Sequence, residues 1–187
     1  MATRVLGLAV AVLTASSFAA AGELPAGSLY LEPLQWTDDT GAPVELSDFR
    51  GQPVALTMFY SECRSTCPIT LAKLRAIDAA FALRKQDVQI VLVSYDSRRD
   101  LPRQLARFRR SERLPAGRWH LLSGSPSGVA RLAGRIGLGS YVDLGEHVVH
   151  SFRILLLDGE GVARGALDAR HSDVASLFQA SGPGAVP

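Results

Sequence analysis

Three apolar runs of strand length divide the chain and limit what it can fold into. They cover residues 53–60, 88–95 and 148–157, and each is suited to a strand buried inside a sheet. The first two runs are followed by segments with apolar residues at helical spacing, at 68–81 and 101–110. Strands that alternate with helices in this way predict an α/β fold with a central sheet flanked by helices.

Smaller elements complete the prediction. A short strand is expected at 119–122, and a helix from Pro126 to about Ile136. The third apolar run ends at a turn-forming segment, residues 158–161, so residues 162–167 are predicted to return beside it as a hairpin. A last short helix is expected at 172–179.

Length and composition indicate one folded domain. The chain has 187 residues, of which 47% are apolar and 20% charged, which excludes a largely disordered chain. Two cysteines are too few for a disulfide scaffold. The net charge of +2 does not require a nucleic-acid partner, and we expect none.

The N-terminus has the pattern of a targeting segment. Arg4 precedes an apolar stretch at 5–13, and Ala19-Ala20-Ala21 fits a signal-peptidase site. We therefore predict a cleaved signal peptide at 1–21, a domain at 22–180 and a flexible tail at 181–187. The mature chain would then reside in the periplasm or another extracytoplasmic compartment. The alternatives are a retained anchor, which would associate the chain with a membrane, and a buried N-terminal helix.

The two cysteines, Cys63 and Cys67, lie between the first predicted strand and the helix that follows it. A helix N-terminus stabilises a thiolate, the form of cysteine that attacks disulfides and binds metals. Two soft thiolates favour Cu(I) or Zn over harder ions. A structural disulfide, or two buried thiols, is the simpler alternative.

A third ligand would come from a histidine. The chain has four: His120, His147, His150 and His171. His147 and His150 both lie near the start of the third apolar run, and their spacing alone does not choose between them.

Several segments resemble one family of proteins. Residues 59–68, with the sequence FYSECRSTCP, resemble the CxxxCP signature of the Sco/SenC family. Residues 93–100, 119–124 and 149–161 are similar to further segments of that family, and the resemblance extends over about 34–161.

This resemblance implies a thioredoxin-like fold and a copper protein that serves cytochrome c oxidase assembly. It also implies that Cys63, Cys67 and His150 are the copper ligands. Two sulfurs and one imidazole nitrogen suit Cu(I) and also accept Cu(II). The sequence departs from the family pattern at Arg64, which would lower a thiol pKa, and at Val149, where an aspartate is common.

Four competing functions are consistent with these residues. The first is a copper chaperone that delivers copper to the binuclear copper site of an oxidase subunit, or to another periplasmic copper or thiol protein. The second is a thiol–disulfide oxidoreductase in which Cys63 and Cys67 form the redox pair. The third, a thiol peroxidase of the peroxiredoxin type, is a weaker hypothesis, because the sequence lacks the Thr/Pro-rich loop that normally leads to the nucleophilic cysteine. The last is a binding module whose cysteines are only structural.

An arginine-rich segment, residues 98–118, contains eight arginines. Arg103, Arg107 and Arg110 fall on one face of the predicted helix. Such a face can bind an acidic partner or anionic lipid. The simpler interpretation, which the sequence favours, is a solvated helix face.

Overall fold

A seven-stranded sheet forms the centre of the fold. The structure is a computed structural model, and it describes residues 22–62, 66–138, 142–143, 148–149, 152–168, 170–171 and 173–178. The strands, in chain order, are β1 Gln35–Asp38, β2 Pro43–Glu45, β3 Val54–Phe59, β4 Gln89–Ser94, β5 Trp119–Gly124, β6 Val142–Asp143, β7 Val148–Val149, β8 Arg153–Leu157 and β9 Ala163–Asp168. The order across the sheet is β2-β1-β5-β4-β3-β8-β9, while β6 and β7 form a separate two-stranded sheet. The predicted signal segment, residues 1–21, and the predicted tail, residues 181–187, lie outside the described residues.

The middle of the sheet is parallel, and its borders are antiparallel. β4 lies between β3 and β5 and is parallel to both, whereas β1 and β8 run antiparallel to their neighbours β5 and β3. Every residue of β3 and β4 is buried. Strands covered on both faces have no solvent side to mark with polar residues, which explains the unbroken apolar runs.

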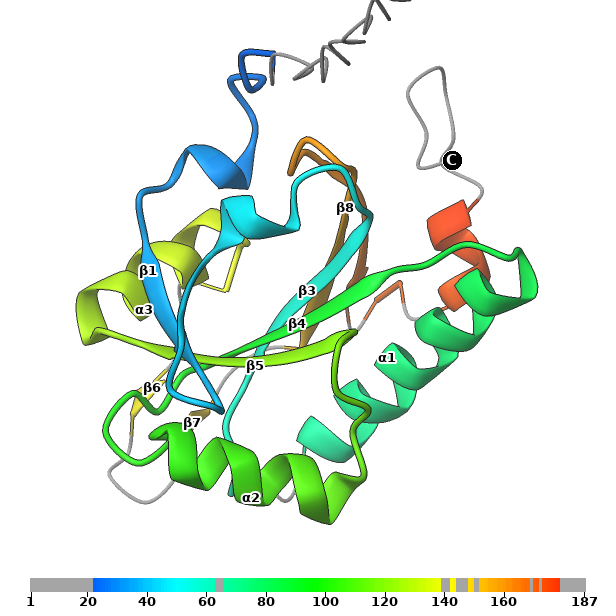
Figure 1. Cartoon of the computed structure of the whole chain (residues 1–187). Helices are drawn as coiled ribbons and strands as arrows, with labels where there is room; N and C mark the ends of the chain where they lie inside the picture. Colours follow the sequence, from blue (N-terminus) through cyan, green and yellow to red (C-terminus); the bar gives the residue numbers. More distant parts are fainter. Residues whose placement is uncertain are drawn as a thin grey trace, which may run out of the picture.

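Helices cover both faces of the sheet. The α-helices are α1 Thr66–Leu83, α2 Pro102–Glu112 and α3 Pro126–Arg135, and the 3-10 helices are η1 Leu29–Leu31, η2 Leu46–Phe49 and η3 Val174–Phe178. α1 and α2 lie on one side and α3 on the other (Figure 1). The predicted α/β class, a central sheet flanked by helices, is confirmed.

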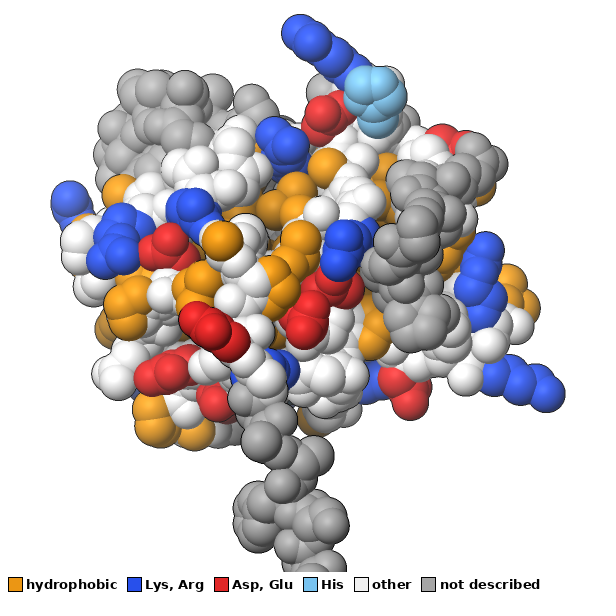
Figure 2. All heavy atoms as spheres, turned by 90° about the horizontal axis from the view of Figure 1, so that it is seen from above, with side chains coloured by type: hydrophobic (Ala, Val, Ile, Leu, Met, Phe, Trp, Pro, Cys, Tyr) orange, Lys and Arg blue, Asp and Glu red, His pale blue; other side chains and the backbone are white. Residues whose placement is uncertain are grey.

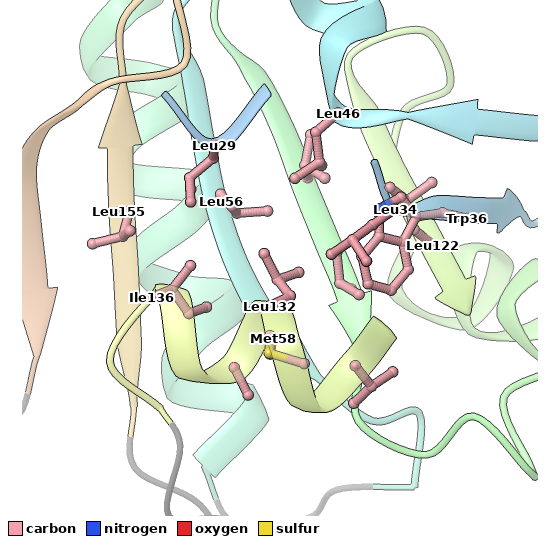
Figure 3. Packing of buried hydrophobic residues seen from close by; sticks show 14 of the residues in the cluster. Leu29, Leu34, Trp36, Leu46, Leu56, Met58, Leu122, Leu132, Ile136 and Leu155 are labelled. Carbon is pink, nitrogen blue, oxygen red and sulfur yellow. The ribbon is translucent and has the colours of Figure 1, made fainter. Parts of the chain in front are cut away.

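Two apolar cores follow from the alternation of side chains along the strands. In β3, Leu56 and Met58 pack toward α3, as the close view shows (Figure 3). Ala55 and Phe59 point the other way, into the core shared with α1 and α2. The sheet is thereby fixed in register, because a shift of one residue would exchange the two sets.

The third apolar run is not one strand, contrary to the sequence prediction. It is divided into β7, which pairs with β6 in the small sheet, and β8, which pairs with β3 and β9 in the large one. Because the two halves bond to different partners, the chain has to leave one sheet before it enters the other. Apolar character does not reveal which partner a strand chooses. The last predicted helix, 172–179, is the shorter η3, which is a 3-10 helix.

Within the described residues, no helix combines the length and the apolar character needed to cross a lipid bilayer.

Candidate functional site

The predicted cysteine segment connects β3 to α1. β3 ends at Phe59 and α1 begins at Thr66, so the chain changes from strand to helix at the carboxyl edge of the parallel strands. Functional sites of α/β folds gather at this edge. Cys67 belongs to the first turn of α1. Cys63 lies outside the described residues, as do the side-chain contacts of Cys67.

His150 and His147 also lie outside the described residues, and the description of the chain resumes at Phe152, just before β8. Thr57 of β3 pairs with Ile154 of β8, and the Thr57 hydroxyl donates a hydrogen bond of 2.6 Å to the Arg153 carbonyl. The start of β8 therefore lies beside the final residues of β3. Phe152, two positions after His150, leads directly into that start.

The other two histidines have roles elsewhere. His120 lies at the beginning of β5, at the opposite edge of the parallel strands, where its Nε2 lies 2.8 Å from Oε1 of Gln89 and its ring contacts Phe49 edge-on. Burial, and then the nearby Arg109 guanidinium, lower the pKa of His120. His171 is exposed in the turn after β9, and its backbone N–H donates to Asp168 over 2.9 Å.

Asp100 is a functional candidate that the sequence analysis did not identify. Its side chain is buried, with 2% of the residue exposed. One carboxylate oxygen accepts a 2.9 Å bond from the Ser61 backbone N–H and a bond from the Ser94 hydroxyl, while the other accepts from the Ser61 hydroxyl. Ser61 stands two positions before Cys63, and Ser94 ends β4. The carboxylate therefore connects the start of the cysteine segment to the neighbouring strand.

Burial also affects the chemistry of this carboxylate. It raises the pKa of Asp100, while the hydrogen bonds from Ser61 and Ser94 oppose the rise. The segment 93–100 was noticed only because it resembles a family motif. The sequence signal that could have identified Asp100 is its place as a polar residue just beyond a buried strand, at the carboxyl edge of the sheet. Its bond to Ser61, 39 positions earlier, depends on the tertiary fold and has no local sequence signal.

α2 packs beside the same edge. The ring of Phe108 in α2 lies 5.1 Å from the ring of Phe59, the last residue of β3. Leu101, at the start of α2, is 50% exposed, and Ile69, in the first turn of α1, is 58% exposed. Two of the large apolar side chains exposed in the described part of the chain therefore adjoin the cysteine segment.

The pattern of the SCO1/SenC family matches residues 23–180 of this sequence. The chain belongs to the SCO1/SenC family. This agrees with the sequence-based resemblance, and the match covers nearly all of the domain predicted at 22–180.

Known relatives are distant in sequence and similar in fold. The SCO1 protein homolog of Bacillus subtilis (strain 168) is 26% identical over 94 residues, which is 50% of this chain and 49% of the relative. The chain thus spans about half the length of that relative. The copper-bound structure of Arabidopsis thaliana ScoI has a TM-score of 0.68 at 24% identity, covering 78% of this chain and 91% of that one.

A third relative is BsSco, described as a member of the Sco family of cytochrome c oxidase assembly proteins in a study of its disulfide switch. Its structure has a TM-score of 0.67 at 21% identity and covers 81% of this chain and 92% of that one. These matches bear out the thioredoxin-like fold that the sequence predicted.

Proposed function

We propose that this SCO1/SenC protein is a periplasmic copper chaperone that delivers copper to the binuclear copper site of cytochrome c oxidase. Copper is its cargo, and Cys63, Cys67 and His150 are the ligands. The observation that carries the proposal is the position of Cys67 in the first turn of α1, directly after the buried strand β3. The copper-bound structure of the Arabidopsis relative and the assembly role of the Sco family support it.

The chemistry of the proposed donors suits copper. Two thiolates are soft donors that select Cu(I), and an added imidazole makes the set acceptable to Cu(II). The N-terminus of α1 favours the ionised form of the Cys67 thiol, because the unpaired backbone N–H groups there carry partial positive charge. The hydrogen bonds that Ser61 donates to the Asp100 carboxylate would hold Ser61, two positions before Cys63, in one geometry.

The test is an anaerobic copper titration of the reduced protein, followed by absorption in the sulfur-to-copper charge-transfer region. One copper per chain is expected for the unaltered protein. Cys67→Ser should lose that absorption, because a hydroxyl is a poor soft ligand. Full copper binding by the serine variant would overturn the assignment.

The two candidate histidines are separated by a matched pair of variants. His150→Ala should lose Cu(II) more than Cu(I), because two thiolates alone still satisfy Cu(I). His147→Ala should retain both ions. If His147→Ala is the more damaging change, the ligand set is wrong.

A second candidate function, thiol–disulfide exchange, is favoured by the same helix position of Cys67. One thiolate would attack a partner disulfide, and the other would resolve the mixed disulfide. The partner then gains two electrons and two protons, and Cys63 and Cys67 form a disulfide. Reduction of a disulfide in the oxidase copper domain, without copper transfer, would favour this function over the first.

A further inference from the structure

Four arginines in and just before α2 differ from several others in the described part of the molecule. Arg131 and Arg135 both contact the Glu32 carboxylate, and Arg164 contacts Asp158 at 2.6 Å. Arg98, Arg103, Arg107 and Arg110 are exposed, and the described residues supply no carboxylate partner for them. We call these four residues the arginine stripe.

The helix geometry places the three stripe residues that belong to α2 on its outer face. Arg103, Arg107 and Arg110 are spaced at i, i+4 and i+7, so they share one side of the helix. Leu105 and Phe108 are buried on the opposite side. Arg109 is directed differently, because it forms a two-pronged contact of 2.6 Å for each prong with the Asp39 carboxylate. The stripe is therefore a face of like charge that the fold leaves open to solvent.

The stripe begins beside the candidate site. Arg98 precedes Asp100 by two positions, and Asp100 is bonded to Ser61 at the start of the cysteine segment. The middle of α2 is also close to the end of β3, through the contact of Phe108 with Phe59. At the other end of the molecule, Lys and Arg side chains are interspersed with Asp and Glu (Figure 2). α2, which carries three of the stripe arginines, lies instead at the end of the sheet where β3 leads into the cysteine segment (Figure 1).

Apolar groups adjoin the same segment. Leu101 begins α2, and Ile69 lies in the first turn of α1; both are at least half exposed. Protein-binding surfaces commonly combine an apolar centre with a polar rim, and arginine is enriched in them. We infer that the arginine stripe, with Leu101 and Ile69, is the docking surface for a protein partner whose contact face is acidic. The choice of partner rests on the proposed function.

A membrane surface fits these observations less well. A helix that lies in a lipid interface inserts its apolar side among the acyl chains. The apolar side of α2 is not available for insertion, because Leu105 and Phe108 are buried in the core against the sheet. Opposite charges across a protein interface would instead steer the partner toward the cysteine segment and speed its association.

The experiment measures binding of the copper-loaded full protein to the soluble copper-site domain of the oxidase subunit from the same organism. The triple variant Arg103→Gln, Arg107→Gln, Arg110→Gln should bind about ten-fold more weakly or worse at low salt. The corresponding triple lysine variant should keep most of the affinity, because it keeps the charge. A control with Arg131→Gln, Arg135→Gln and Arg164→Gln removes the same charge elsewhere and should bind like the unaltered protein.

Raising the salt from about 50 mM to about 300 mM should weaken binding of the unaltered protein and reduce the difference between the variants. Equal binding by the glutamine triple and the unaltered protein would overturn the docking surface, as would failure of the unaltered protein to bind the domain. Stripe-dependent binding to phosphatidylglycerol–phosphatidylcholine vesicles in place of the domain would overturn it in favour of lipid. Stripe-dependent docking without copper transfer would leave the surface standing and refute the proposed function.

Discussion

The segments that adjoin the two ends of β3 are held by different contacts. Before the strand, the Gly51 N–H donates to the Gly159 carbonyl over 2.7 Å, and in the same β8–β9 turn the Gly161 carbonyl accepts from the Leu29 N–H over 2.9 Å. At the end of β3, Ser61 is held by the buried carboxylate of Asp100. The last residue of β3, Phe59, also accepts a backbone bond of 2.7 Å from the Tyr95 N–H. Backbone contacts depend little on which side chains are present, whereas the contacts of Ser61, two positions before Cys63, depend on the Asp100 side chain.

This difference predicts that the two ends of β3 contribute differently to stability and to copper binding. Changes at the beginning of β3 should alter the free energy of unfolding and leave the chemistry of the folded protein intact. Changes at the Asp100 contact should alter both.

Gly161→Ala should have the largest effect, a loss of about 3 kcal/mol in the free energy of unfolding. Gly161 has a φ of 77°, in the left-handed region that favours glycine, and an added Cβ would lie 2.6 Å from Cγ of Tyr30. Urea unfolding followed by circular dichroism measures the loss. Copper affinity of the folded variant should be unchanged, and a weaker affinity would break the proposed division between the two ends.

Asp100→Ala should cost about 2 kcal/mol, because the Ser61 N–H and the two serine hydroxyls lose a charged acceptor. In contrast to the glycine variant, it should also weaken copper binding of the folded protein, by about ten-fold. The check is a competition titration against a chelator of known copper affinity, at a temperature where the variant is fully folded. An unchanged affinity would mean that Asp100 serves stability alone.

Arg109→Gln supplies the matched control for this change and should cost about 1 to 2 kcal/mol. Arg109 and Asp39 fasten α2 to the end of β1 through a contact in which the side chains are 18% and 8% exposed. The contact is charged and largely buried, as at Asp100, but it does not reach the cysteine segment. Stability should therefore fall in the same chelator and urea experiments while copper affinity stays constant. If Arg109→Gln also lost copper affinity, the effect of Asp100→Ala on affinity would be explained by reduced stability of the whole fold.

The sequence was sufficient for the parts of the molecule that depend on local pattern. Buried strands are continuous apolar runs, and the position of Cys67 in the first turn of a helix follows from its neighbours. It was not sufficient for contacts between distant segments. The bond of Asp100 to Ser61 joins two loops that lie 39 positions apart in the sequence, and the division of 148–157 depends on which partner each half pairs with. Likewise, the open arginine face became distinct only once other arginines were found in ion pairs.

The pH dependence of unfolding should carry opposite signs at the two ends. Burial lowers the pKa of His120, near the start of β3, below its ordinary 6.5, so the unfolded chain takes up a proton first as the pH falls. This contribution is present above pH 6.5 and is lost as the pH falls through the folded pKa. Burial raises the pKa of Asp100 above 3.8, so its contribution is present below that pH and is lost as the pH rises through the folded pKa.

Two conservative variants separate these contributions, which should be the smallest of the effects considered. Relative to the unaltered protein, His120→Gln should lose less stability on acidification below pH 6.5, because the neutral side chain has no proton to take up. Asp100→Asn should lack the decline that occurs as the pH rises above 3.8. Urea unfolding of all three proteins across this range gives the slopes. If both variants change the slope in the same direction, the buried histidine and the buried carboxylate do not act as opposed titrating groups, and the contrast between the two ends of β3 is one of geometry alone.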